Sequence, residues 1–304
     1  MMKILIGYDG SNCADAALAD LQRAGLPSEA EALVITVDEQ WPPTPTSYWK
    51  MPTSPASTRQ VSDETRDLAR RAGECLRELF PSWEVRAEAQ GGSPASVILA
   101  GAREWKPDLI VVGSRGRTGA AMLLLGSVSQ KVLQRAPCSV RVARGRVIPL
   151  DSPIKIIVGV DGSAEAEAAP RAVAGRRWPD GTQVLLLSAV PSVSAVARAG
   201  MVGVVNQWID QELARAQEST GRMESEQRAT GLGVNVSLVE GDPKIVLLEA
   251  AERQGADSIF VGSSGMSALD RFLLGSVSEA VATRADCSVE VVRSHRNEES
   301  DREL

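Results

Sequence analysis

Two glycine-rich stretches with the same spacing are the part of this sequence best suited to chemistry. GSRGRTGAAMLLLGS fills residues 113–127 and GSSGMSALDRFLLGS fills residues 262–276, so each has GSxG, nine further residues and GS. Glycine has no Cβ, which lets backbone amides approach an anion closely and adopt positive φ at little cost. We expect a helix to open at the final GS, and its unpaired N-terminal amides also favour an anion. The spacing therefore predicts a phosphate-binding site in each stretch.

A polyphosphate suits two amide clusters that converge on one point. Several charge-assisted hydrogen bonds of about 1.5 to 3 kcal/mol each offset the desolvation of a triphosphate. The hydroxyls of Ser127, Ser129, Ser276 and Ser278 are expected to add direct donors. The alternative is that the glycines only permit tight strand-to-helix turns, because duplication copies neutral features too. The chain has neither GxxxxGK[ST] nor GxGxxG after its first strand, which excludes a P-loop enzyme and a standard dinucleotide binder.

The two stretches belong to a duplicated domain. ILIGYDGS at 4–11 matches IIVGVDGS at 156–163, with Asp161 standing 152 positions after Asp9. From the third predicted strand onward the offset is 149, as for Gly92 and Gly241. The first copy therefore carries three extra residues before its third strand.

Each copy alternates β-branched apolar runs with helical patterns, which is typical of a parallel sheet covered by helices. We predict an α/β protein of two tandem Rossmann-like domains, each a five-stranded parallel sheet flanked by helices. They occupy residues 1–147 and 152–293, and 294–304 form a disordered charged tail. The predicted strands are 3–8, 32–37, 84–89, 109–113 and 139–143 in the first copy and 155–160, 183–189, 234–239, 258–262 and 288–292 in the second.

Helix starts carry recognisable signals. An apolar period follows the Ser11/Asn12 cap, and Ser93 and Asp242 each precede a proline at the expected first helical position. Pro170 lies inside the first helical pattern of the second copy, so that helix is expected to start late or to kink.

Composition narrows the class of protein. A net charge of −6 and a pI of about 5.1 remove the attraction on which nucleic-acid and anionic-membrane binders rely, so neither partner is expected. The chain has one histidine and no CxxC, so no zinc cluster is expected, and the four free cysteines are expected to be buried. The start MMKILIGYDG has a single lysine, and its apolar run is too short for a signal peptide. No apolar run in the chain reaches the length of about 18 residues that a membrane-spanning helix needs. These features predict a cytoplasmic protein.

Two further segments invite a functional interpretation. Residues 41–58 hold five prolines, two tryptophans and a tyrosine after the second predicted strand, and they could form a lid or merely a stiff loop. His295 lies in the charged tail, where no catalytic role is expected because a solvated tail preorganises little.

The repeated motifs resemble those of the universal stress proteins, in a tandem form with two fused domains. The resemblance covers 3–143 and 155–293. It rests on GYDGS and GVDGS, on PDLIVVGSRGR and ADSIFVGSSGM, and on LLLGSVSQKVLQRAPCSVRVAR with FLLGSVSEAVATRADCSVEVVR. The glycine stretches match the GxxGx9G[ST] pattern of the ATP-binding subgroup in both copies. The resemblance implies the adenine nucleotide alpha hydrolase-like variant of the Rossmann-like fold.

The resemblance also implies which residues contact ATP. Asp9 and Asp161, with Gly7 and Gly159 behind them, face the ribose or adenine side, although an aspartate that only caps a turn is the alternative. Val37 and Ala189 supply the adenine contact. The implied phosphate contacts are Gly113, Arg115, Gly116, Gly126, Ser127, Val128 and Ser129 in the first copy and Gly262, Gly265, Gly275, Ser276, Val277 and Ser278 in the second. Ser264 and Met266 replace Arg115 and Arg117, and Ala268 replaces Gly119, so weaker phosphate binding is expected in the second copy. Arg271 in the connecting loop is the residue that could compensate.

Three functions remain open from these residues. The first is a regulatory stress-response protein whose state depends on bound ATP. The second is a slow ATPase or phosphotransferase in which Asp9 or Asp161 helps to hold Mg²⁺ near the phosphates. The third is an interaction module without a nucleotide.

The last strands, SVRVA and SVEVV, are expected at exposed sheet edges, which favour pairing. Similar proteins dimerise by antiparallel pairing of these strands. The two copies can do so within one chain as a pseudo-dimer, and two chains can associate further as a homodimer.

Overall fold

The computed structural model describes residues 1–39, 61–116, 125–144, 152–161, 163, 166–190, 214, 232–264 and 274–293. The first half is composed of β1 (Met2–Gly7), α1 (Asn12–Asp20), the 3₁₀ helix η1 (Leu21–Arg23), β2 (Ala30–Asp38), α2 (Asp63–Leu79), β3 (Glu84–Gly91), α3 (Pro94–Trp105), β4 (Leu109–Gly113), α4 (Ser127–Arg135) and β5 (Ser139–Ala143). The second half is composed of β6 (Lys155–Gly159), α5 (Ala168–Ala174), β7 (Gln183–Val190), β8 (Gly233–Glu240), α8 (Pro243–Gln254), β9 (Ser258–Gly262), α9 (Ser276–Arg284) and β10 (Ser288–Val292).

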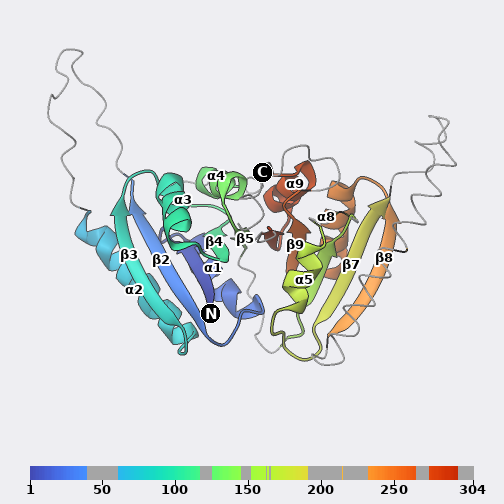
Figure 1. The fold of residues 1–304 in the computed structure, drawn as a ribbon, viewed down its shortest axis with the longest axis horizontal. Coiled ribbons are helices and arrows are strands. Elements are labelled where there is room, and N and C mark those ends of the chain that lie inside the picture. Colours follow the sequence, from blue (N-terminus) through green and yellow to red (C-terminus); the bar gives the residue numbers. More distant parts are fainter. Residues whose placement is uncertain are drawn as a thin grey trace, which may run out of the picture.

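The ten strands form one continuous sheet, in the order β3-β2-β1-β4-β5-β10-β9-β6-β7-β8 (Figure 1). Within each half all neighbouring strands are parallel, as predicted. The halves join where β5 pairs antiparallel with β10, and Arg141 stands opposite Glu290. The predicted pairing of the two last strands within one chain is therefore confirmed, and each strand that was expected to be an edge lies in the middle of the sheet.

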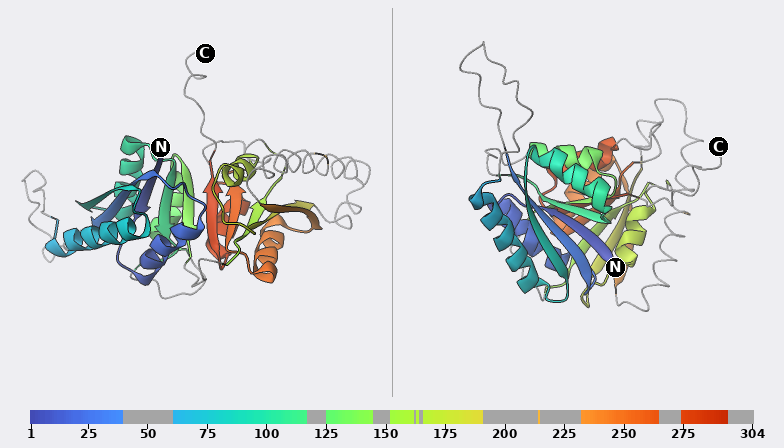
Figure 2. Two further views of the ribbon diagram at one scale, coloured as in Figure 1. Left: turned by 90° about the horizontal axis from the view of Figure 1, so that it is seen from below. Right: turned by 60° about the vertical axis from the view of Figure 1, so that its left-hand side comes forward.

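Helices cover both faces of the sheet (Figure 2). On one face a single apolar core runs through both halves, and α3, α4, α8 and α9 contribute to it together with alternate strand residues such as Leu5. On the other face each half has its own core. Ile4 and Ile6 pack there with α1 and α2, while α5 covers the second half. Successive side chains of β1 thus point to opposite faces of the sheet, and both faces of the strand are buried.

The predicted helix starts are confirmed. Ser11 caps α1 through its side chain, while Ser93 and Asp242 are the N-caps of α3 and α8 with proline at the first helical position. The helix that contains Pro170 starts late, at Ala168, so that the proline lies in its first turn, where the ring is tolerated.

The expectation that all four cysteines are buried is wrong for Cys75, which is exposed on α2, and only partly right for the half-buried Cys13. The buried stripe of α2 is narrow and consists of Ala69, Ala72, Gly73 and Leu76, and Cys75 lies outside that spacing. Cys138 and Cys287 are buried as expected.

Several predictions lie outside the described residues. These are the alternatives for residues 41–58, the tail at 294–304 with His295, the loops of the glycine stretches at 117–124 and 265–273, and therefore Gly265. Within the described part of the chain, no helix is both long and apolar enough to cross a bilayer.

Candidate functional site

The glycine bend after β4 lies directly against the start of α4. A Cβ added to Gly126 would stand 3.3 Å from the Cα of Arg115 and 3.7 Å from the backbone nitrogen of Gly116. The Gly126 amide donates to the carbonyl of Ser114 at 2.8 Å, and the Ser114 amide donates to Ala143 at the end of β5. These contacts hold the bend and the helix start together, as the spacing predicts. The buried side chain of Leu125 anchors the residue before the helix.

The helix start offers backbone donors but fewer than the sequence suggests. The first-turn amides of Ser127, Val128 and Ser129 have no acceptor within their own helix, and the N-cap Gly126 has no side chain to satisfy them. The Ser129 hydroxyl, in contrast, donates to the carbonyl of Gly113 at 2.6 Å. The expectation that this hydroxyl is a direct donor to phosphate is therefore wrong, because its single proton is already used to attach α4 to β4. The Gly126 amide is used in the same way.

Asp9 stands beside the bend. A Cβ on Gly116 would come within 2.7 Å of the Asp9 Oδ2, so only glycine fits there without displacing the carboxylate. Asp9 Oδ1 accepts the Ser11 amide at 3.0 Å, which forms a turn into α1 with Gly10 at φ +74°. Asp9 thus has the turn-capping role of the alternative interpretation, and its second oxygen faces the glycine bend.

The second half repeats the arrangement with differences. Gly275 donates to the Ser263 carbonyl at 2.7 Å, and the Ser278 hydroxyl donates to Gly262 at 2.6 Å, so the expectation that Ser278 is a phosphate donor through its hydroxyl is also wrong. Asp161 Oδ1 accepts both the amide of Ser163 at 3.0 Å and its hydroxyl at 2.6 Å. The Ser276, Val277 and Ser278 amides form the first turn of α9, again with a glycine N-cap.

The other predicted residues lie at the same edge of the sheet. Because Gly7 pairs with Ile35, Val37 lies two residues beyond the paired end of β1, and Ala189 has the same relation to Gly159 through Leu187. Both lie partly buried against the core. Gly7 has a packing role, since a Cβ there would lie 2.7 Å from the Ile98 side chain of α3. A Cβ on Gly159 would lie 3.0 Å from Val261.

Charged groups near this edge are fixed by specific partners. The backbone N–H of Ser62, at 2.9 Å, lowers the pKa of the Asp38 carboxyl, which ties the end of β2 to the start of α2. Burial lowers the pKa of the Arg144 guanidinium, and the positive charge of Arg115 acts in the same direction. Burial and a hydrogen bond to Asp15 raise the pKa of the Tyr8 hydroxyl.

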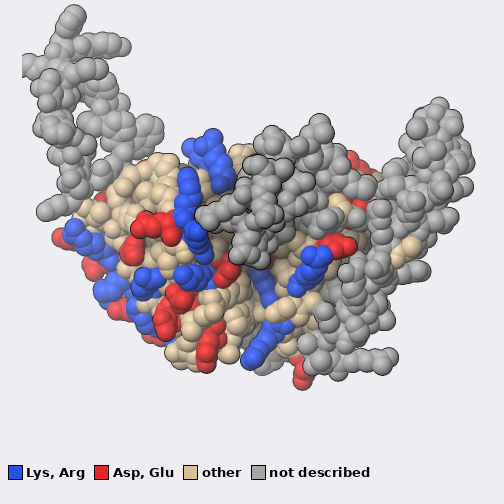
Figure 3. Space-filling view, viewed as in Figure 1, with Lys and Arg blue, Asp and Glu red and all other residues tan. Residues whose placement is uncertain are grey.

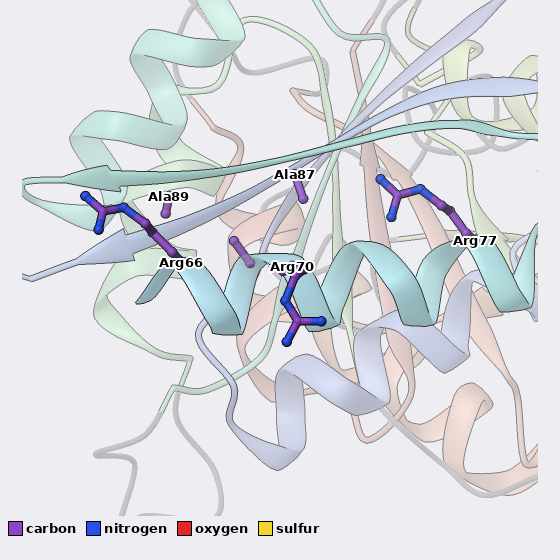
Figure 4. A pocket seen from close by; sticks show the side chains of 6 residues that line it. Arg66, Arg70, Arg77, Ala87 and Ala89 are labelled. Carbon is purple, nitrogen blue, oxygen red and sulfur yellow. The ribbon is translucent and has the colours of Figure 1, made fainter. Parts of the chain in front are cut away.

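An open groove of about 250 Å³ lies elsewhere, between α2 and β3, lined by Arg66, Ala69, Arg70, Arg77, Ala87 and Ala89. Figure 4 shows Arg66 and Arg77 beside β3, whereas Arg70 points away from the strand. Arg66 pairs with Asp63, Arg70 pairs with Glu74 and Arg77 donates to the Val85 carbonyl. On the face seen in Figure 3, acidic and basic side chains are interspersed over the first half. The groove is therefore a weaker candidate than the glycine bends, because its cations already have partners.

Sequence reasoning missed two kinds of residue at this edge. The carbonyls of Ser114 and Ser263 hold the helix starts, and both serines stand inside the repeated glycine motifs. Arg144 and Arg293 reach across to the other half, where Arg144 donates to the Ala282 carbonyl and Arg293 to the Leu133 carbonyl. No local pattern reveals these long-range contacts. Arg144 and Arg293 do stand at equivalent positions of the two repeats, and this is a signal that the sequence offers.

Each half is thus a parallel α/β unit in which a glycine bend meets a helix start at the carboxyl edge of the sheet, and the chain is a tandem of two such units. The model of the universal stress protein family matches residues 1–144 and 154–293. Since these matches cover nearly the whole chain, the protein belongs to the universal stress protein family.

Individual proteins agree with this assignment. A universal stress protein of Mycobacterium tuberculosis is 29% identical over 297 residues, which is 95% of this chain and 96% of that protein. The Bacillus subtilis universal stress protein YxiE is 33% identical over 148 residues, 47% of this chain and 98% of its own length. The crystal structure of a universal stress protein from Archaeoglobus fulgidus has a TM-score of 0.61 at 20% identity, with 96% of this chain and 98% of that chain covered, and supports the fold.

Proposed function

We propose that the protein binds ATP at the carboxyl edge of each half and acts as a regulatory stress-response protein in the cytoplasm. The observation that supports this is the contact between the glycine bend and the start of α4, with Asp9 beside it. The first turn of α4 has a glycine N-cap without a capping side chain, whereas α1, α2 and α8 are capped by Ser11, Ser62 and Asp242. The N-caps of α3 and α5 make no side-chain hydrogen bond either, so the site is defined by the glycine bend beside α4 and not by the missing cap alone. An N-terminus left without a cap suits an anionic ligand.

The residues present fit a nucleotide triphosphate. In the first half the amides of Ser127, Val128 and Ser129 would hold phosphate oxygens, and the Ser127 hydroxyl is exposed at the same turn. Arg115 adds a positive charge at the bend, and Asp9 is placed to accept from ribose hydroxyls. Val37 lies at the adjacent strand end, where an adenine ring would pack. The second half supplies the equivalent amides of α9 but has the buried Ser264 in place of Arg115.

A regulatory role suits this site better than catalysis. The chain has a single histidine, and among the residues that the structure describes no group of three or more His, Cys, Asp or Glu could hold a metal ion. We infer that ATP occupancy shifts the population of states of this protein, since a ligand that prefers one state stabilises it. The proposal includes the bounds of the two domains, residues 1–147 and 152–293.

The test begins with the purified protein, which is denatured so that any released adenine nucleotide can be identified by mass spectrometry. ATP is then titrated calorimetrically into the wild type and into Gly116→Ala, with Mg²⁺ present and absent. We expect Gly116→Ala to weaken ATP binding in the first half by about tenfold or more, because the new Cβ meets the Asp9 Oδ2 at 2.7 Å.

Gly233→Ala is the matched control. Among the described residues, the nearest atom to its Cβ would be the Thr182 carbonyl oxygen at 3.8 Å, so the substitution adds a methyl group in ordinary van der Waals contact and leaves ATP binding unchanged. Absence of released nucleotide together with an affinity no tighter than about 1 mM contradicts the proposal. So does an equal affinity for the wild type and Gly116→Ala.

A further inference from the structure

Four charged side chains, two of them in buried residues, form a series across the junction between the halves. We name Asp20, Arg141, Glu290 and Arg176 the central charge series. Arg141 Nε donates to Asp20 at 2.6 Å, Arg141 Nη1 lies 3.5 Å from Glu290, and Arg176 Nη1 donates to Glu290 at 2.9 Å. The side chains of Arg141 and Glu290 are each only 1% exposed, and those of Asp20 and Arg176 are 9% and 8% exposed. The signs therefore alternate through a region with little solvent to screen them.

The series lies on the pseudo-twofold axis of the duplication. Glu290 follows Arg141 by 149 positions, so the two residues are equivalent in the repeat, and they also stand opposite one another in the β5–β10 ladder. A residue that faces its own equivalent marks the centre of a twofold arrangement. If two first halves paired in this register, Arg141 would face another Arg141. Two second halves would bring two Glu290 carboxylates together, and like charges directly opposite in a sheet are destabilising.

Some contacts at the junction are symmetric and do not distinguish like from unlike halves. The Arg144 amide donates to the Ser288 hydroxyl at 2.9 Å, and the Arg293 amide donates to the equivalent Ser139 at 3.1 Å. Each half contributes the same groups to these bonds. Their presence means that the backbone alone permits either kind of pairing, so that selection must come from elsewhere.

Other contacts reinforce the asymmetry. Arg23 pairs with Asp257 at 3.1 Å, but Gly175 stands at the position in the second half equivalent to Arg23. Gly25, at φ +64°, lies under the Trp178 ring, whose nearest atoms would be 2.7 Å from an added Cβ. Arg176 also donates to the Ala24 carbonyl at 2.8 Å. Each of these contacts joins a feature of one half to a different feature of the other.

We propose that the central charge series is a pairing code, by which the β5 edge selects the unlike β10 edge and rejects a second copy of itself. The fitting partner for the first half is the second half of this same protein. Specificity of this kind arises as much from the penalty on the wrong pair as from the gain in the right one. The code keeps the inner edges of the sheet paired within one chain. This inference does not depend on the bound ligand.

The first test uses the full chain with a protease site inserted between residues 147 and 150 and cut after folding. Mild denaturant separates the halves, dilution lets them pair again, and native mass spectrometry counts like and unlike pairs by mass. Random pairing gives unlike pairs in about half of the dimers, and we expect an excess of about tenfold or more over like pairs. Like pairs at the random share overturn the proposal.

The second test uses the intact chain and remains informative if the cut halves fail to pair. Glu290→Arg puts a third guanidinium between Arg141 and Arg176, whereas Glu290→Gln keeps the size and removes only the charge. We expect Glu290→Arg to melt about 6 °C or more below Glu290→Gln. Equal melting temperatures overturn the proposal. If Glu290→Arg does not fold, Glu290→Gln is compared with the wild type in the cut chain. The proposal then requires a several-fold smaller excess of unlike pairs in Glu290→Gln. An unchanged excess overturns it.

Discussion

At the scale of single residues, the two serines at the start of α4 have different tasks although they stand two positions apart. The Ser129 hydroxyl is buried and donates its proton to the Gly113 carbonyl, whereas Ser127 is exposed at the N-terminal turn. The first holds the helix against the strand, and the second is available to a ligand. A neutral hydrogen bond of this kind contributes about 1 kcal/mol to stability.

This division predicts that alanine substitutions at Ser129 and Ser127 affect different properties of the protein. Ser129→Ala should lower the free energy of unfolding by about 1 kcal/mol, and Ser278→Ala should do the same in the second half. Ser127→Ala should leave the stability unchanged and weaken ATP binding. Denaturant unfolding and calorimetric titration measure the two effects. A loss of stability in Ser127→Ala without any loss in Ser129→Ala would show that the assignment is reversed.

At the scale of elements, the two helices that start at the glycine motifs end against the opposite half. Arg144 donates to the carbonyls of Ala282, Thr283 and Cys287 at 2.6, 3.2 and 3.3 Å, at and beyond the end of α9. Arg293 donates to Leu133 near the end of α4 at 3.0 Å. A cation at the C-terminus of a helix interacts favourably with the helix dipole and satisfies carbonyls that have no partner in the helix. Each candidate site is therefore built on a helix that the other half helps to hold.

The unequal number of bonds predicts unequal effects. Arg144→Met should lower the free energy of unfolding by about 2 to 3 kcal/mol, and Arg293→Met by about 1 kcal/mol, since hydrogen bonds to charged groups contribute more than neutral ones. The Arg293 Nε is also buried with no hydrogen-bond partner within the described residues, which reduces what its removal costs. Denaturant unfolding of the two variants provides the comparison. A loss in Arg293→Met that equals or exceeds that in Arg144→Met contradicts this account.

At the scale of the whole molecule, the two halves share a fold but not their charges. Arg115 is half-buried at the first bend, whereas the equivalent Ser264 is 5% exposed. This difference points to the first half as the stronger site.

We therefore expect two unequal affinities for ATP in the wild type. Arg115→Ser should weaken the first half by about tenfold, toward the value of the second. Ser264→Arg should not strengthen the second half, because Ser264 is only 5% exposed and a charge at a buried position is costly to desolvate. Calorimetry on these variants resolves the two sites. Tighter binding in the second half than in the first would contradict the role given to Arg115.

Much of the fold follows from local patterns in the sequence. Continuous apolar runs such as residues 4–6 predict strands buried on both faces, and the Ser11, Ser93 and Asp242 caps mark helix starts. The duplicated GSxG and GS spacing also indicates that a bend and a helix start meet. These features depend on the stereochemistry of a few neighbouring residues, which is why the strands and the tandem arrangement can be predicted from the order of the amino acids alone.

The tertiary structure decided which hydrogen-bonding groups remain for a ligand and which side chains meet across the junction. The sequence predicts that Ser129 has a donor, but only the approach of α4 to β4 directs that proton to Gly113. It places Arg141 and Glu290 at equivalent positions, but only the antiparallel pairing of β5 and β10 brings them face to face. The physical reason is that such contacts join residues well separated along the chain, so their geometry depends on the packing of the complete molecule.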